Sequence, residues 1–304
     1  MSERSGSSDA RSSVWITATM IAVLLLGAFV LWHDLGTREV LGRDENATII
    51  KLDQPGLPAV LHANGLKANG QPSSMQPLYF LVQHLVWPVI DHSAFLLRLL
   101  PSVFALLSIV FTFKLGQVLW RWEVGLVGAL LVTVLPLHVQ YGQTIRPYPL
   151  LCLLLLATAY FMLQGLRTNS LWHWMGFVVA AVLGVYTHLN ASLALAAMGI
   201  FTAIVWLSTV ASLWTRRKDE SPATREEWLR RLVLPALAFV LVILGCIPAI
   251  LRLLELRWIA TGGQIAGEIR VELTIAFFYR YLYKIGLTSA WSRGLILGLM
   301  ALGL

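Results

Sequence analysis

The chain has 304 residues, of which 57% are hydrophobic and only 13% are charged, and its formal net charge is +7. A soluble domain carries roughly 25% charged residues, so this composition excludes a soluble globule and indicates several membrane-spanning helices. The positive charge is typical of cytoplasmic loops that face anionic lipid headgroups. No basic patch interleaved with aromatic residues points to nucleic acid, so none is expected as a partner.

The chain begins with a serine-rich segment, residues 1–13, which is expected to be disordered and cytoplasmic. The apolar run Val14–Trp32 follows without the cleavage site of a signal peptide, so it predicts an uncleaved first membrane helix. Arg4 and Arg11 precede this run. The positive-inside rule therefore places the N-terminus in the cytoplasm and the following loop, residues 33–94, outside.

One segment of this loop, residues 75–90, is apolar but has only 16 residues and contains Gln76, Gln83 and His84. A membrane span needs about 20 residues. Tyr79 and Trp87 are residue types that settle at the membrane–water interface. We therefore expect a helix that lies in the interface and does not cross the bilayer.

Six further apolar runs are expected to cross the membrane in alternating directions: residues 95–118, 124–140, 148–166, 172–187, 191–214 and 232–250. This order places the basic segment 216–231 in the cytoplasm, whereas a crossing by residues 75–90 would move that segment outside. The sequence thus predicts an all-α polytopic membrane protein, with residues 14–304 as one transmembrane domain. Because the chain ends within the apolar stretch 294–304, we expect this domain to continue further.

Several polar residues fall at the outer membrane face in this topology. They include the adjacent pair Asp44 and Glu45, and with them Lys51, Arg98, Gln143, Arg146, Tyr148, His188 and Asn190. Each alone has an ordinary explanation, since loop carboxylates are often solvated and an arginine can extend to lipid headgroups. Their convergence on one face indicates a functional site, because polar groups at span ends require partners.

Four segments carry a resemblance to a known family: residues 42–45 (Gly-Arg-Asp-Glu), 74–80 (Ser-Met-Gln-Pro-Leu-Tyr-Phe), 97–102 (Leu-Arg-Leu-Leu-Pro-Ser) and 136–148. The last contains Tyr-Gly-Gln-Thr-Ile-Arg-Pro-Tyr. In this order the segments resemble the protein mannosyltransferase and aminoarabinose-transferase group, polyprenyl-phosphate-sugar-dependent glycosyltransferases of the GT-C superfamily. Thr144 stands where that family has an acid, and the family's histidine before Pro-Leu-Tyr is missing.

The resemblance implies a GT-C-type bundle of transmembrane helices whose long first extracytoplasmic loop carries juxtamembrane helices. It also implies a glycosyltransferase of the inner or plasma membrane that serves the cell envelope. The partners would be membrane lipids, a polyprenyl-phosphate-linked sugar as donor, and an acceptor glycan, lipid or protein. A single in-line displacement outside the cytoplasm would invert the anomeric centre.

This chemistry requires a base near the acceptor and cations near the leaving phosphate. Asp44 is the candidate base, and Glu45 either positions it or joins a metal site. We expect Arg98 and Arg146 to hold the lipid phosphate, with Lys51 as a weaker candidate. Four residues are expected to line the groove or position the substrate: Tyr79, Tyr148, His188 and Asn190.

No ligand cluster with metal spacing is present in the sequence, so a divalent metal is left open. Two other classes of function also stay open. A transporter or flippase for lipid-linked sugars would use the same basic and aromatic groove without an acid–base residue. A non-catalytic membrane protein would bind such lipids without turning them over. Turnover of a lipid-phosphate sugar separates an enzyme from both.

Overall fold

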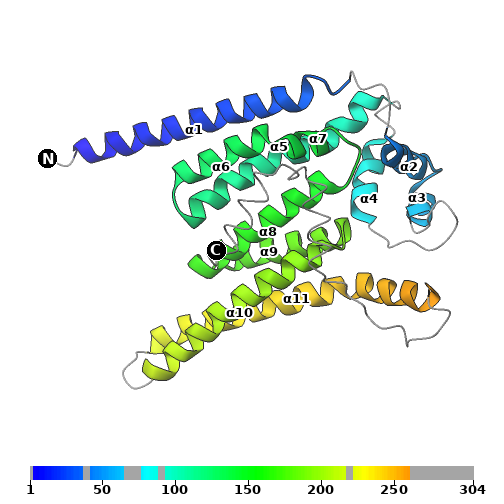
Figure 1. The fold of residues 1–304 in the computed structure, drawn as a ribbon. Coiled ribbons are helices and arrows are strands. Elements are labelled where there is room, and N and C mark those ends of the chain that lie inside the picture. The colour runs from blue at the N-terminus through cyan, green and yellow to red at the C-terminus, as the bar shows by residue number, and fades with distance from the viewer. Residues whose placement is uncertain (1–2, 37–41, 65–76, 88–92, 217–221, 261–304) are drawn as a thin grey trace, which may run out of the picture. The chain divides into compact units, whose positions relative to one another are not determined.

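The computed structural model describes residues 3–36, 42–64, 77–87, 93–216 and 222–260. Every regular element in these ranges is an α-helix (Figure 1), and several are apolar and long enough to span a bilayer. The protein is therefore an all-α polytopic membrane protein, as expected. The chain divides into two compact units, Met1–Leu256 and Arg257–Leu304. Most of the second lies outside the described residues, so the single domain at 14–304 stays a prediction.

The helices follow one another in the order α1 (Glu3–Trp32), α2 (Arg43–Leu52), α3 (Leu57–Asn64), α4 (Pro77–Val86), α5 (Ala94–Leu119), α6 (Trp122–Val134), α7 (Pro136–Gly142), α8 (Tyr148–Thr168), α9 (Leu171–Thr187), α10 (Ala191–Arg216) and α11 (Pro222–Ala260). Among the described residues, α1, α5, α8, α10 and α11 each contain an apolar segment long enough to cross a membrane. α9 is apolar but has only 17 residues.

Two elements differ from the expectation. α1 begins at Glu3 and includes residues that were expected to be disordered. A helix that is already nucleated by its apolar part extends at low cost, one hydrogen bond per added residue. The expected continuous run at 124–140 is instead a pair of helices, α6 and α7, bent by 62°. Pro136 causes this break, because proline lacks a backbone N–H and forces the preceding Leu135 into extended conformation.

α4 covers the described part of the segment at 75–90, which is expected not to cross the membrane, and it is short. Its ten residues reach about 15 Å, half the thickness of a bilayer's hydrocarbon core. Tyr79 and Phe80 of this helix pack with Leu52 of α2 and Val60 of α3, and Leu150 of α8 completes the cluster. The short helices of the first loop are thus attached to the end of the bundle (Figure 1).

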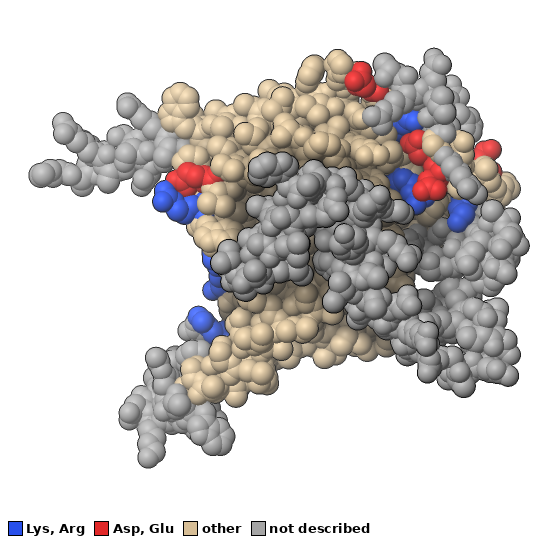
Figure 2. Space-filling model, in the orientation of Figure 1, with Lys and Arg blue, Asp and Glu red and all other residues tan. Residues whose placement is uncertain are grey.

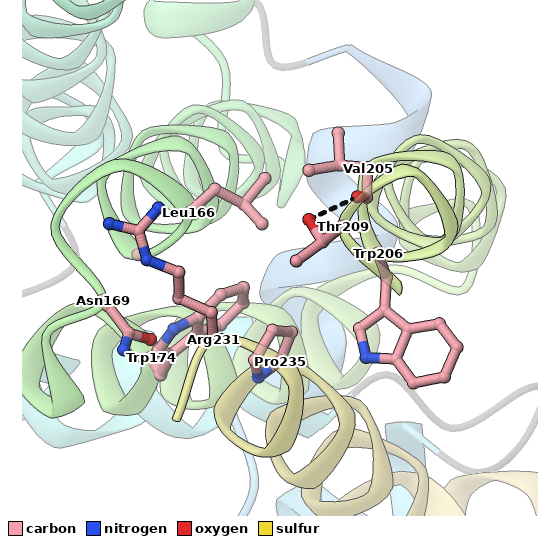
Figure 3. Close-up of a pocket in the computed structure, with 9 residues that line it drawn as sticks. Leu166, Asn169, Trp174, Val205, Trp206, Thr209, Arg231 and Pro235 are labelled. Carbon is pink, nitrogen blue, oxygen red and sulfur yellow. Dashed lines mark hydrogen bonds between the residues drawn. The ribbon is translucent and has the colours of Figure 1, made fainter. Parts of the chain in front are cut away.

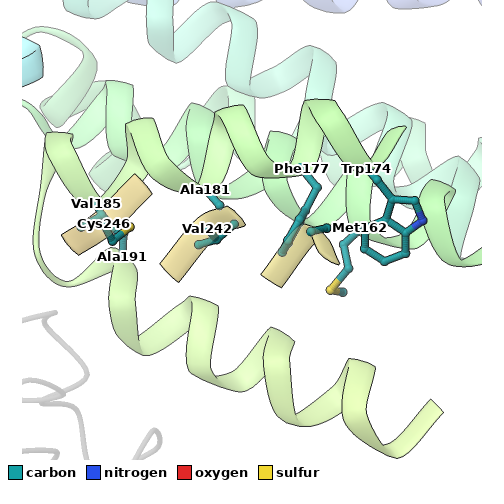
Figure 4. Packing of buried hydrophobic residues seen from close by; sticks show 9 residues of the cluster. Met162, Trp174, Phe177, Ala181, Val185, Ala191, Val242 and Cys246 are labelled. Carbon is teal, nitrogen blue, oxygen red and sulfur yellow. The ribbon is translucent and has the colours of Figure 1, made fainter. Parts of the chain in front are cut away.

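The interior of the bundle is held by close helix packing. α5 and α6 meet at Gly116 and Gly125, where a Cβ on either residue would collide with the backbone of the other helix. A second contact joins α9 to α8 and α11, where Trp174 and Phe177 of α9 share a buried cluster with Met162 of α8 and Val242 of α11 (Figure 4). Within α9 the two rings pack edge to face with centroids 5.7 Å apart. Cys246 is a buried member of this cluster.

The outer surface fits a bilayer. Large apolar side chains on α10 are exposed, among them Leu193 at 71% and Ile200 at 65%. Figure 2 shows the charged side chains of the described residues at two ends of the view, with a broad uncharged surface between them. A water-soluble protein does not expose an apolar patch of this extent, so lipid covers this surface.

Candidate active site at the amino ends of α2 and α8

The site is built on the first turn of α2. Gly42 is the N-cap of this helix, and Asp44 and Glu45 lie in its first turn, where the positive end of the helix dipole favours carboxylates. Glu45 turns back to its own helix end, and its Oε2 accepts a hydrogen bond of 3.0 Å from the Gly42 backbone N–H. The adjacent Asp44 points elsewhere and is exposed.

Glu45 is buried and connects three segments of the chain. Its two carboxylate oxygens accept hydrogen bonds of 3.2 Å from Nε and Nη2 of Arg98 in α5. Oε1 also accepts a hydrogen bond of 3.0 Å from the backbone N–H of Ile145, just before α8. Burial raises the pKa of Glu45, but the bonds from Arg98, Ile145 and Gly42 outweigh it and hold this pKa below its ordinary value.

Arg98 takes a different place from the one we expected. Its side chain is 2% exposed, and beyond its two bonds to Glu45 its Nη1 donates to the Leu35 carbonyl at 3.4 Å. A guanidinium in the first turns of an apolar helix cannot stay uncompensated, so it pairs with the nearest carboxylate. Arg98 therefore anchors Glu45 and the end of α1, and it is not open to a phosphate in this structure.

Arg146 faces the open side of the site. Its Nη2 lies 3.6 Å from Oδ2 of Asp44, whose side chain is 76% exposed. The same Nη2 donates to the Tyr148 hydroxyl at 3.3 Å, and the guanidinium lies over the Tyr148 ring at 5.4 Å from its centroid. The two adjacent carboxylates of α2 thus pair with different arginines. Glu45 pairs with Arg98 inside the protein, and Asp44 pairs with Arg146 at its surface.

Aromatic rings continue from Arg146 toward the turn between α9 and α10. Tyr148 packs edge to face against Tyr141 at 4.9 Å and lies 5.7 Å from the His188 ring. Nδ1 of His188 accepts a hydrogen bond from the Asn190 backbone N–H. Burial and the nearby charge of Arg146 lower the pKa of His188, so the imidazole is neutral at pH 7. Asn190 itself is exposed at this turn.

Lys51 and Tyr79 lie on the other side of the candidate site, opposite the aromatic rings. Lys51 is half-buried, its ammonium lies 5.8 Å from the Phe80 ring centroid, and burial together with Arg146 lowers its pKa. Tyr79 is fully buried, and its hydroxyl has no hydrogen-bond partner among the described residues. Burial raises the pKa of Tyr79 far above its ordinary value, so the phenol stays protonated.

Two supporting contacts were missed by reasoning from the sequence. Gln143 donates to the Leu31 carbonyl at 3.1 Å, which joins the end of α1 to the turn before α8. Trp32 donates to the Ser102 hydroxyl at 2.8 Å. Both Gln143 and Ser102 lie in motifs that carried the resemblance, and Gln143 was also among the polar residues expected at one membrane face, but neither signal predicted the partner. Within the described ranges, no three His, Cys, Asp or Glu side chains cluster as metal ligands.

Residues 71–218 match the model of one protein family, described as dolichyl-phosphate-mannose-protein mannosyltransferase. The match confirms the resemblance drawn from the sequence, and it supports glycosyltransferase activity of the GT-C type with a polyprenyl-phosphate-linked sugar as donor. Arg98, Arg146 and His188 lie within the matched mannosyltransferase segment, whereas Asp44 and Glu45 precede it. No curated protein matches the chain.

Proposed function

We propose that this protein transfers a sugar from a polyprenyl-phosphate donor to an acceptor hydroxyl on the extracytoplasmic side of the membrane, with inversion at the anomeric carbon. The observation that carries the proposal is the position of Arg146. It lies 3.6 Å from a solvent-exposed carboxylate, Asp44, and its charge is close enough to lower the pKa of Lys51. A base and two cations are therefore gathered at one end of the helix bundle.

The two cations support an anionic ligand. Arg146 and Lys51 are both partly buried, and like charges at close range repel most strongly where water is scarce. Among the described residues, the exposed Asp44 is the only carboxylate within ion-pair distance of either. A lipid phosphate between the two cations would relieve their repulsion, and the planar guanidinium suits two of its oxygens.

The reaction would proceed as one displacement. The acceptor oxygen attacks the anomeric carbon, and Asp44 takes the proton of the acceptor hydroxyl. The bond between the anomeric carbon and the phosphate oxygen breaks, and its electron pair leaves with the phosphate. Arg146 and Lys51 stabilise the charge that develops there. Attack from the face opposite the leaving group inverts the anomeric configuration.

The remaining residues would position this machinery. The bond between Glu45 and Arg98 would hold α2 in position against α5. The hydrogen bond from the Ile145 N–H to Glu45 would hold in position the backbone next to Arg146. Tyr148 and the neutral His188 would line the part of the site that holds the donor sugar. Tyr79 would keep a protonated phenol at the inner wall.

The proposed sidedness rests on charge. Lys114, Arg121, Arg167 and Arg231 lie at or near helix ends on the cytoplasmic side of the expected topology, while the candidate site lies at the opposite ends of α5 and α8. Excess lysine and arginine mark cytoplasmic loops. The N-terminus would then be cytoplasmic and residues 33–94 extracytoplasmic.

Turnover tests this function directly. The full chain is reconstituted in liposomes with polyprenyl-phosphate mannose labelled in the sugar, and an envelope extract serves as acceptor. We expect label to leave the lipid and free polyprenyl phosphate to accumulate. A flippase would instead move intact labelled lipid between leaflets without breaking the sugar–phosphate bond. Binding without either outcome would identify a non-catalytic protein.

A further inference from the structure

A polar cavity lies at the end of the bundle opposite the candidate active site. It has a volume of about 120 Å³ and is lined by residues of α8, α9, α10 and α11. Figure 3 shows Asn169, Trp174, Thr209 and Arg231 around it. α8 has 21 residues, from Tyr148 to Thr168. Arg146 lies at its N-terminal end and the cavity at its C-terminal end, so the two are about 30 Å apart, the thickness of the hydrocarbon core. The cavity is thus distinct from the catalytic machinery proposed above.

The walls of this cavity offer hydrogen-bond donors and a positive charge. Arg231 supplies the guanidinium, and Asn169 and Thr209 supply an amide and a hydroxyl. Trp174 is 2% exposed, yet its indole Nε1 has no hydrogen-bond partner among the described residues. A buried donor without an acceptor is costly, so the site favours a ligand that brings oxygen atoms. Donors and a cation together suit a phosphate.

The indole of Trp174 is held in place by a close approach to α8. A Cβ at Gly165 would lie 2.8 Å from Cε2 of Trp174, so only glycine leaves room for the ring here. Asn169 follows at the end of α8 with a left-handed backbone, φ 52°, and thereby turns the chain around the cavity. The cavity is therefore a product of specific local geometry.

An apolar crevice adjoins the cavity. Its volume is about 270 Å³, and it lies between α10 and α11, where Gly199, Ala203 and Phe239 line it. Trp206 and Pro235 line both spaces, so the polar cavity and the crevice lie side by side. The Trp206 indole is fixed at this junction by donation to the Leu232 carbonyl at 3.1 Å.

The two spaces together have an amphipathic lining, polar in the cavity and apolar in the crevice. Arg231 begins the apolar span Arg231–Leu251, which places the polar cavity at a membrane interface. From there the crevice extends along α10 toward the middle of the span. A phospholipid of that leaflet would meet the cavity with its headgroup and the crevice with its acyl chain. Arg231 favours an anionic headgroup, since a zwitterionic one carries a cation of its own.

We propose that the cavity beside Arg231 and Trp174 and the crevice at Gly199 and Phe239 bind one anionic glycerophospholipid of the surrounding bilayer. The phosphate occupies the cavity, and one acyl chain lies between α10 and α11. Such a lipid fills the gap between these two helices and joins them to α8 and α9. Binding of this lipid does not depend on catalysis, so it is tested by measuring bound lipid and not turnover.

The full chain is purified in detergent, and retention of added lipid is measured by native mass spectrometry with phosphatidylglycerol, phosphatidylcholine or polyprenyl phosphate. We expect one phosphatidylglycerol per chain, bound at least about tenfold more tightly than phosphatidylcholine, the usual worth of one charge-assisted contact. Arg231→Gln should abolish this preference. The matched control is Arg167→Gln, an exposed arginine at the same end of the bundle that does not line the cavity.

A second pair of variants tests the acyl-chain part. Ala203→Leu fills the crevice and should lower phosphatidylglycerol retention, whereas Ala197→Leu on the exposed face of α10 should leave it unchanged. Equal loss in Arg167→Gln and Arg231→Gln would overturn the assignment to this cavity. Equal retention of phosphatidylcholine would overturn the anionic headgroup. Stronger retention of polyprenyl phosphate, lost in Arg231→Gln, would show that the occupant is a polyprenyl lipid and not a glycerophospholipid.

Discussion

Glu45 and Arg98, 53 positions apart in the chain, form a buried ion pair in which both carboxylate oxygens accept a hydrogen bond from one guanidinium. This pair joins α2 to α5 and, through the Ile145 N–H, to the start of α8. Asp44, one residue earlier, is left to face Arg146 at the surface. The adjacent carboxylates therefore have separate roles, and the predictions below distinguish them.

Glu45→Gln should destabilise the protein. The substitution leaves the Arg98 guanidinium buried without its counter-charge, a loss of about 3–5 kcal/mol for pairs of this kind. Thermal unfolding in detergent micelles should show a clearly lower midpoint. Glu123→Gln is the control, because Glu123 pairs with Arg121 in solvent and its loss should change the midpoint little. Equal midpoints for the two variants would contradict the anchoring role of Glu45.

Asp44→Asn should behave in the opposite way. The Asp44 side chain is 76% exposed, so its loss should leave the unfolding midpoint unchanged. If Asp44 takes the acceptor proton, sugar transfer should fall by about 10²-fold or more. Asp53→Asn, an exposed carboxylate at the other end of α2, is the matched control and should keep full activity. Near-normal transfer by Asp44→Asn would remove this residue from the mechanism.

Arg146→Lys should weaken donor binding while preserving charge. Lysine cannot reproduce the planar contact with the Tyr148 ring or present two parallel N–H groups to a phosphate. We expect KM for the polyprenyl-phosphate sugar to rise by roughly tenfold, the equivalent of one charge-assisted hydrogen bond. Tyr148→Phe keeps the ring and removes only the hydroxyl, so it should have a smaller effect. An unchanged KM in Arg146→Lys would assign the phosphate to other residues.

Stability should fall in acid because of Glu45. Its pKa is lower in the folded protein than in the unfolded chain, so its stabilising contribution is present above the ordinary glutamate value of about 4.3. That contribution is lost as the pH falls through the lower, folded-state pKa. The unfolding midpoint of the wild type should therefore drop more steeply below about pH 4 than that of Glu45→Gln. Parallel curves would show that other carboxylates dominate.

Sidedness can be read with single cysteines in a background without Cys152 and Cys246. Cysteines at the exposed positions Asp53 and Asn190 should react with an impermeant thiol reagent added outside intact cells. A cysteine at Thr168, exposed at the other end of α8, should react only after the membrane is opened. The reverse pattern would place the candidate site in the cytoplasm.

Much of the fold follows from the sequence, because lipid requires every backbone polar group to be bonded within its own segment. Apolar runs of sufficient length therefore predict helices, and α1, α5, α8, α10 and α11 contain the expected runs. The ten-residue length of α4 fits the prediction that the segment at 75–90 does not cross, and the crossing itself stays a prediction. The break at Pro136 could have been predicted from proline's missing N–H, but the apolar run around it concealed the signal.

The roles of individual charges were decided only by the tertiary structure. Asp44 and Glu45 are adjacent carboxylates in the sequence, and Arg98 and Arg146 are both arginines at the N-terminal ends of apolar runs. Which carboxylate meets which arginine depends on the rotation of α2 against α5 and on the turn before α8. Burial then separates the pairs: Arg98 cannot reach water and takes Glu45, while Arg146 keeps an open side beside Asp44. Sequence determines which charges are present, and three-dimensional packing determines which of them remain accessible to a ligand.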